Sequence, residues 1–109
     1  MSPLLLRTSP KTHFHLMPTR REFIEYLCDQ AQLGARLEYR KMFGEYALYL
    51  DGKVVAFVCD NQLFLKPTGE GRTFLGEVEL APPYPGARDY FLLSSELDEP
   101  DRLRTVLEI

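Results

Sequence analysis

The dipeptide Asp51-Gly52 constrains the fold of this chain more than any other sequence feature. It separates two runs of strand-like residues, 45–50 and 53–59. Two-residue hairpin turns need a positive φ at both central positions, which Asp and Gly accept more readily than most residues. The chain is therefore expected to fold around an antiparallel β-hairpin.

Further strands are expected on both sides of this hairpin. Residues 37–42 alternate in a mixed pattern, and Gly44 marks a turn or bulge where a side chain would not fit. The run 53–59 is apolar on both faces, so it should be a central strand covered on both sides. Asp60-Asn61 predicts a second tight turn, after which residues 62–66 pair back. The result is a meander of three or four antiparallel strands.

Helical patterns stand at both ends of this meander. Thr19, with Glu22 three residues later, has the spacing of a capping box and predicts a helix start. Gly34 is the expected C-cap. Pro100 suits the first turn of a last helix. The apolar residues that recur at helical spacing are Phe23, Ile24, Leu27, Cys28 and Ala31 in the first helix and Leu103, Val106 and Leu107 in the last. This order of elements predicts an α+β two-layer domain, with an antiparallel sheet packed against N- and C-terminal helices.

Residues 67–86 are rich in proline and glycine and are expected to be largely irregular, with a short helical turn at 73–75. A strand should resume over 87–93. The sequence Gly-Glu-Gly-Arg at 69–72 superficially resembles a phosphate loop. It lacks the Lys-Ser/Thr ending, so it is interpreted as a flexible turn. Tyr84, inside the proline segment 82–86, either plugs an open end of the core, which is favoured, or makes an exposed contact.

Length and charge restrict the function classes. A chain of 109 residues with 45% hydrophobic residues is one globular domain, and a formal net charge of −3 argues against a domain built mainly to bind nucleic acid. Residues 1–44 carry 7 basic and 4 acidic side chains, whereas residues 45–109 carry 6 and 12. The candidate interaction residues of basic type are Arg36, Arg40, Lys41 and Lys66; a solvated charged face is the plainer interpretation.

Catalysis is not expected. The two histidines, His13 and His15, lie in a loose tail over residues 1–16, so the folded part lacks the commonest general base. No cofactor or metal site is indicated. Cys28 and Cys59 are interpreted as buried, reduced thiols of a cytoplasmic protein. No apolar run is long enough for a membrane span, and either Met1 or Met17 could be the true start.

The segment Arg40-Lys41-Met42-Phe43-Gly44-Glu45-Tyr46 and the hairpin Asp51-Gly52-Lys53 together resemble the signature of the TfoX/Sxy family, N-terminal domain. Met42, Phe43, Gly44, Asp51 and Gly52 are its structural signature here. The pieces Phe57-Val58-Cys59-Asp60, Leu63-Phe64-Leu65-Lys66 and Tyr90-Phe91-Leu92-Leu93 support the resemblance, which covers about residues 19–109. Ala47 stands where the family commonly has glycine.

The resemblance implies a secretion-chaperone-like α+β fold and a link to the regulation of natural competence. Full-length regulators carry a second, C-terminal helical domain, whereas this chain stops at Ile109. We therefore expect a stand-alone domain over 17–109. Its expected role is that of a non-enzymatic regulatory module that contacts a protein partner or a second copy of itself. The alternative is a nucleic-acid-associated transcriptional regulator domain that uses the basic patch.

Overall fold

A computed structural model describes residues 19–42 and 44–109 of the chain. The expectations for the tail 1–16, for His13 and His15, for a start at Met17 and for Phe43 lie outside the described residues. The elements are α1 (Arg21–Ala31), the 3-10 turn η3 (Gly34–Arg36), β1 (Leu37–Met42), β2 (Glu45–Leu50), β3 (Lys53–Cys59), β4 (Gln62–Leu65), α2 (Gly69–Leu75), β5 (Glu79–Ala81), β6 (Tyr90–Leu93), the 3-10 turn η4 (Ser95–Asp98) and α3 (Pro100–Glu108).

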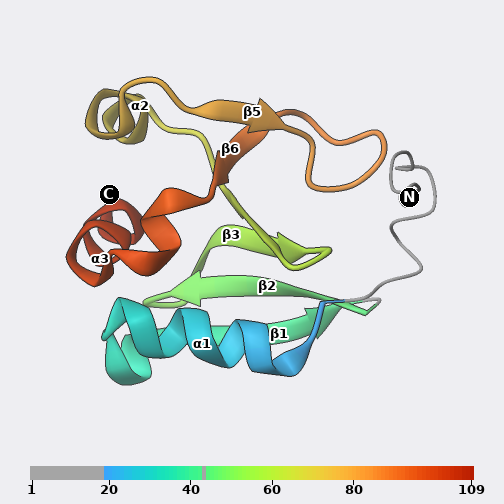
Figure 1. The fold of residues 1–109 in the computed structure, drawn as a ribbon. Helices are drawn as coiled ribbons and strands as arrows, with labels where there is room; N and C mark the ends of the chain where they lie inside the picture. Colours follow the sequence, from blue (N-terminus) through green and yellow to red (C-terminus); the bar gives the residue numbers. More distant parts are fainter. Residues whose placement is uncertain (1–18, 43) are drawn as a thin grey trace, which may run out of the picture.

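The described strands form one six-stranded antiparallel sheet in the order β1-β2-β3-β4-β6-β5 (Figure 1). The tight turns within it were predicted correctly. Asp51 and Gly52 have φ values of 52° and 86°, and Asp60 and Asn61 have values of 55° and 57°. Gly44 has φ 83°, as a turn at that point requires. These local signals confirm the meander and the α+β class.

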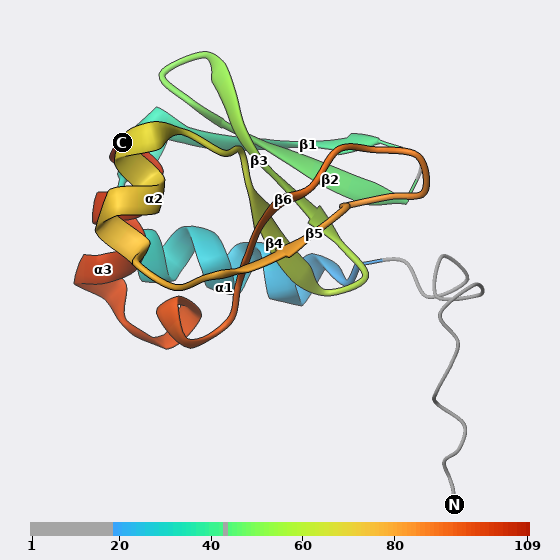
Figure 2. The same ribbon diagram turned by 90° about the horizontal axis from the view of Figure 1, so that it is seen from above.

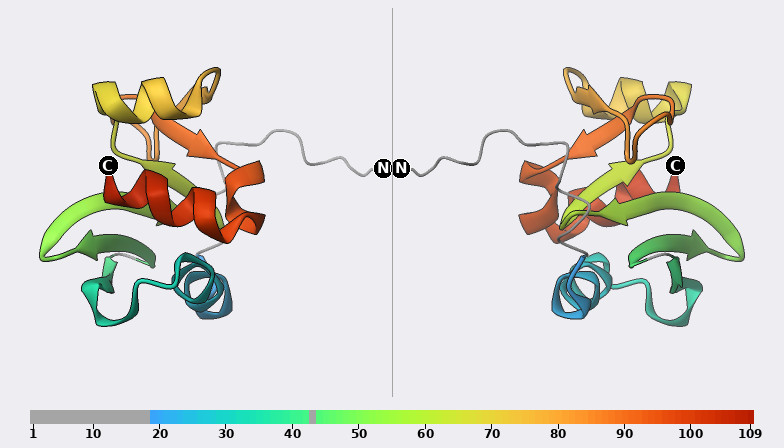
Figure 3. Two further views of the ribbon diagram at one scale, coloured as in Figure 1. Left: turned by 90° about the vertical axis from the view of Figure 1, so that its left-hand side faces the viewer. Right: turned by 90° about the vertical axis from the view of Figure 1, so that its right-hand side faces the viewer.

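The helices share one face of the sheet. Ile24, Leu27 and Ala31 of α1 and Leu103, Val106 and Leu107 of α3 are buried in one cluster with the sheet residues Leu48, Val58, Leu63, Phe91 and Leu93. Figure 1 shows α1 in front of β1, Figure 2 shows α1 and α3 on the same side of β1 and β2, and Figure 3 gives two further views of this layering. Both apolar stripes predicted for the helices therefore face the core, and Pro100 stands at the start of α3 as expected.

The ends of α1 differ from the expectation. The N-cap residue is Arg20, and the side chain of Thr19 makes no cap bond. It turns instead to Glu45, because that carboxylate offers the buried hydroxyl a charged acceptor. The helix ends at Gln32, whose φ of 55° is left-handed, and Gly34 begins η3 instead of capping α1.

The segment 67–86 is more regular than expected. The Gly-Glu-Gly-Arg sequence is the first turn of α2, not a flexible turn, because the Thr68 hydroxyl accepts a hydrogen bond from the Gly71 amide and so caps the helix. After α2, residues Glu79–Ala81 add the edge strand β5 to β6. The strand expected over 87–93 is shorter, since β6 covers only Tyr90–Leu93.

Candidate interaction surface

The face of the sheet opposite the helices, called the open face here, carries an apolar row. Ala47, Phe57, Phe64 and Leu92 are register partners across β2, β3, β4 and β6. Side chains alternate between the two faces of a strand, so this row points away from the core cluster. Phe57 and Leu92 are only half-buried. The expectation that β3 is central is confirmed, but its open face is incompletely covered.

The proline loop covers part of the open face. Pro83 is buried, and the ring of Tyr84 stands edge-on to Phe57 with 6.2 Å between ring centroids. Tyr90 approaches Phe57 from β6 at 5.6 Å. Tyr84 itself remains 51% exposed. The favoured interpretation of Tyr84 as a plug was therefore wrong: the compact Pro83 is buried at this place, and the Tyr84 ring lies at the rim.

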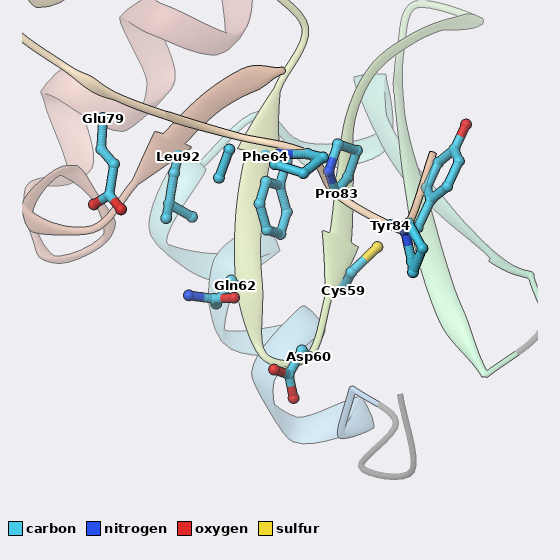
Figure 4. A pocket seen from close by; sticks show the side chains of 11 residues that line it. Cys59, Asp60, Gln62, Phe64, Glu79, Pro83, Tyr84 and Leu92 are labelled. Atoms are coloured by element: carbon cyan, nitrogen blue, oxygen red, sulfur yellow. The ribbon is translucent and has the colours of Figure 1, made fainter. Parts of the chain in front are cut away.

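A groove of about 500 Å³ runs between the proline loop and the strands β3, β4 and β6 (Figure 4). Phe64, Leu92, Pro83 and Cys59 supply apolar walls. Asp60, Gln62 and Glu79 add polar groups. The groove was missed at the sequence level because it depends on where an irregular loop folds, which local patterns do not encode.

The two thiols are poor nucleophiles. Burial raises the pKa of Cys59 to about 12, with further contributions from the charges of Glu45 and Asp60. Burial raises the pKa of Cys28 to about 11, helped by Asp29 and Glu25. The thiolate is the reactive form, so neither cysteine is activated for covalent chemistry. Both are free thiols as expected, but only Cys59 is buried, whereas Cys28 is half-buried at the edge of the apolar stripe of α1.

The predicted basic residues do not form one patch. Arg36 pairs with Asp51 at 2.9 Å and with Glu108 at 2.9 Å, and these bonds raise the pKa of its guanidinium. Arg40 lies over the ring of Tyr49 at 4.7 Å. Lys41 is exposed on β1, whereas Lys66 follows β4, which is separated from β1 by two strands. The sheet therefore brings Arg40 and Lys41 together and leaves Arg36 neutralised and Lys66 apart.

The described signature residues lie at the end of a strand or in tight turns. Met42 ends β1 and is 38% exposed, and Gly44, Asp51 and Gly52 occupy turns. Next to them, Glu45 is a hub that sequence reasoning missed. Its Oε1 accepts hydrogen bonds from the Thr19 amide, the Thr19 hydroxyl and the Asp60 amide. No spacing rule pairs residues 26 positions apart, so no local signal could have found it.

Comparison with known proteins agrees with the fold. A family model described as the TfoX N-terminal domain matches residues 29–108. A protein of Spirochaeta aurantia, described as an uncharacterized 12.7 kDa protein in the trpE 5′ region, is 43% identical over 93 residues, which are 85% of this chain and 81% of that protein. In the part of the chain that the structure describes, no helix is long and apolar enough to cross a membrane.

Proposed function

The chain belongs to the TfoX N-terminal domain family, and from this premise we propose that it is a non-enzymatic regulatory module that holds a segment of another protein on the open face of its sheet. The observation that carries the proposal is the aromatic rim of the groove. Tyr84 is 51% exposed and touches Phe57, which in turn touches Tyr90. Partly exposed aromatic residues beside an apolar recess are typical of protein interfaces.

The chemistry of the groove restricts the partner. Its walls are mainly apolar, and its volume of about 500 Å³ suits a few side chains of an extended segment. The exposed carboxylate of Glu79 stands at the rim, as Figure 4 shows. The partner is therefore a protein segment with apolar residues and a basic side chain that reaches Glu79.

The distribution of charge supports a protein partner over nucleic acid. Nucleic-acid binding needs arginine and lysine side chains that are free to neutralise phosphates, which releases the counterions condensed on the nucleic acid. Arg36 already bonds two carboxylates, and Lys66 lies apart from Arg40 and Lys41. The raised pKa values of both thiols support a role without covalent catalysis.

A position-specific crosslinking experiment tests the proposal. Tyr84 is replaced by the photo-crosslinking residue p-benzoylphenylalanine in cells of the native host. The matched control carries the same residue at Tyr26, which is 42% exposed on the helix side. A discrete protein adduct is expected from position 84 and not from position 26. The variant Glu79→Lys should abolish that adduct, because it places a positive charge against the basic residue of the partner.

Equal adducts from both positions, or adducts that survive Glu79→Lys, would contradict this mode of binding. A titration of labelled duplex DNA at two salt concentrations tests the nucleic-acid alternative. Sequence-selective binding with a dissociation constant below about 1 μM at physiological salt is tighter than usual non-specific binding. That result would contradict the protein-interaction function and favour the nucleic-acid alternative.

A further inference from the structure

The two edges of the sheet are built differently. At one edge, β5 has three residues and leads directly into Pro82 and Pro83. At the other edge, β1 has six residues, contains no proline and pairs with β2 without a register shift. Short strands and prolines protect an edge from further pairing, whereas a long regular edge offers unpaired backbone groups. Among the described residues, β1 is therefore the edge suited to accept another strand.

One hydrogen bond shows which residues of β1 direct their backbone N–H and C=O groups toward β2 and which direct them outward. The Asp51 amide donates to the Arg36 carbonyl at 2.9 Å, at the start of the β1–β2 ladder. Hydrogen-bonded pairs recur at every second residue of an antiparallel ladder. Glu38 and Arg40 consequently bond to β2, and the backbone groups of Leu37, Tyr39 and Lys41 point outward from the sheet.

The charged side chains Glu38, Arg40 and Lys41 of this edge have no oppositely charged partner among the described residues. In the described ranges 19–42 and 44–109, neither Glu38 nor Lys41 forms a hydrogen bond or ion pair through its side chain. Both are exposed. Arg40 contacts only the ring of Tyr49, at 4.7 Å, and its guanidinium has no carboxylate partner in the same ranges. Glu38 and Arg40 lie on the same face of the strand, two residues apart.

We propose that β1 pairs antiparallel with β1 of a second copy of this chain, with Tyr39 opposite the Tyr39 of that copy. In this register the outward backbone groups of the two Tyr39 residues form hydrogen bonds with each other. The outward backbone groups of Leu37 in one copy form hydrogen bonds with those of Lys41 in the other. Glu38 then faces Arg40 of the second copy, and Arg40 faces Glu38, in two positions without backbone bonds where side chains approach most closely.

Electrostatics selects this register over its neighbours. A shift by one pairing step in one direction places Arg40 opposite Arg40, and a shift in the other direction places Glu38 opposite Glu38. Like charges directly opposite each other destabilise a strand pair. Among registers that pair residues of β1 alone, only the one centred on Tyr39 combines the correct backbone parity with two oppositely charged pairs; a register centred on Leu37 would need Arg36, which already pairs with Asp51 and Glu108.

The pairing has a defined geometry. The two-fold axis is perpendicular to the sheet, so the core faces of both copies lie on the same side and the two α1 helices run antiparallel to each other. The groove between the proline loop and β3, β4 and β6 lies away from this edge. The self-association is therefore independent of the proposed protein-binding function, and either can fail without the other.

Sedimentation of the purified protein over a range of concentrations tests the pairing. We expect a reversible dimer. Glu38→Arg should raise its dissociation constant roughly tenfold or more, because two attractive pairs become repulsive. The double variant Glu38→Arg/Arg40→Glu restores opposite charges and should restore the dimer. The control Glu77→Arg, an exposed carboxylate between α2 and β5, should leave dimerisation unchanged.

The register is tested by disulfide crosslinking between differently substituted copies. A mixture of Glu38→Cys and Arg40→Cys proteins should crosslink under oxidised glutathione. A mixture of Glu38→Cys and Met42→Cys proteins should not, since these positions face each other only in the shifted register. A protein that stays monomeric up to about 1 mM, a dimer indifferent to Glu38→Arg, or crosslinking of the second mixture instead of the first would overturn the proposal.

Discussion

The hydroxyl of Thr19 donates a hydrogen bond of 2.6 Å to Oε1 of Glu45, which joins the segment before α1 to the first residue of β2. The Asp60 amide donates to the same oxygen at 3.1 Å, and the Asn61 amide donates to the Thr19 hydroxyl at 3.1 Å. Thr19 is only 6% exposed. One carboxylate thus ties together the start of α1, the β1–β2 hairpin and the β3–β4 turn.

Removal of this carboxylate should destabilise the domain. Glu45→Ala removes the charged acceptor of the Asp60 amide and of the buried Thr19 hydroxyl, which then keeps only the longer bond to the Val58 carbonyl at 3.3 Å, so we expect a cost of about 2 kcal/mol. Urea unfolding followed by circular dichroism measures the change. Glu70→Ala, which removes an exposed carboxylate on α2 without a side-chain bond among the described residues, is the control and should shift the urea midpoint little. An unchanged midpoint for Glu45→Ala would show that water replaces the carboxylate without loss.

Gly44 should resist substitution. Its φ of 83° is a conformation that a residue with a side chain adopts at a cost, so Gly44→Val is expected to destabilise by about 1–3 kcal/mol. Gly69 is the control, because a Cβ there meets no atom within 4 Å and its φ is not positive. Gly69→Ala should leave the urea midpoint unchanged or raise it slightly. Equal effects of the two substitutions would contradict a backbone origin.

Stability at low pH should depend on Asp51. Hydrogen bonds from Arg36 hold the pKa of this carboxyl below its ordinary value. A carboxyl with a lowered pKa in the folded state contributes stability above its unfolded pKa of about 3.9, and that contribution is lost as the pH falls through the folded value. Asp51→Asn keeps a side chain suited to positive φ and should flatten the decline in unfolding midpoint below about pH 4. An identical decline in both proteins would contradict this contribution.

The thiols should react slowly in the folded protein. With pKa values of about 11 for Cys28 and about 12 for Cys59, little thiolate is present at neutral or mildly alkaline pH. Alkylation by iodoacetamide, followed by mass spectrometry, should be at least roughly tenfold slower than for free cysteine. The same reaction in urea is the control and should modify both residues. Rapid alkylation of Cys59 in the folded state would contradict the burial and the raised pKa of this thiol.

The turns and helical stripes could be predicted because each depends on a few adjacent residues. Asp51-Gly52 and Asp60-Asn61 adopt positive φ in the structure as their residue types favour. The apolar spacing in α1 and α3 identified the buried faces. These local preferences suffice for the α+β class and the meander, since hydrophobic periodicity and turn chemistry act over short stretches of chain.

The tertiary structure alone decided which partners distant residues meet. In the folded chain the Thr19 side chain bonds Glu45 and not the end of α1. Arg36 forms ion pairs with Asp51 and Glu108. Tyr84 lies at the rim of the groove, against Phe57. Local signals favoured a capping box and a plug, and they offered a basic patch as the alternative to a solvated charged face. The physical reason is that the stabilisation a carboxylate or an aromatic ring gains depends on which group the fold places beside it and on how far the pair is shielded from water. That group is set by the register and twist of the whole sheet, which no segment encodes by itself.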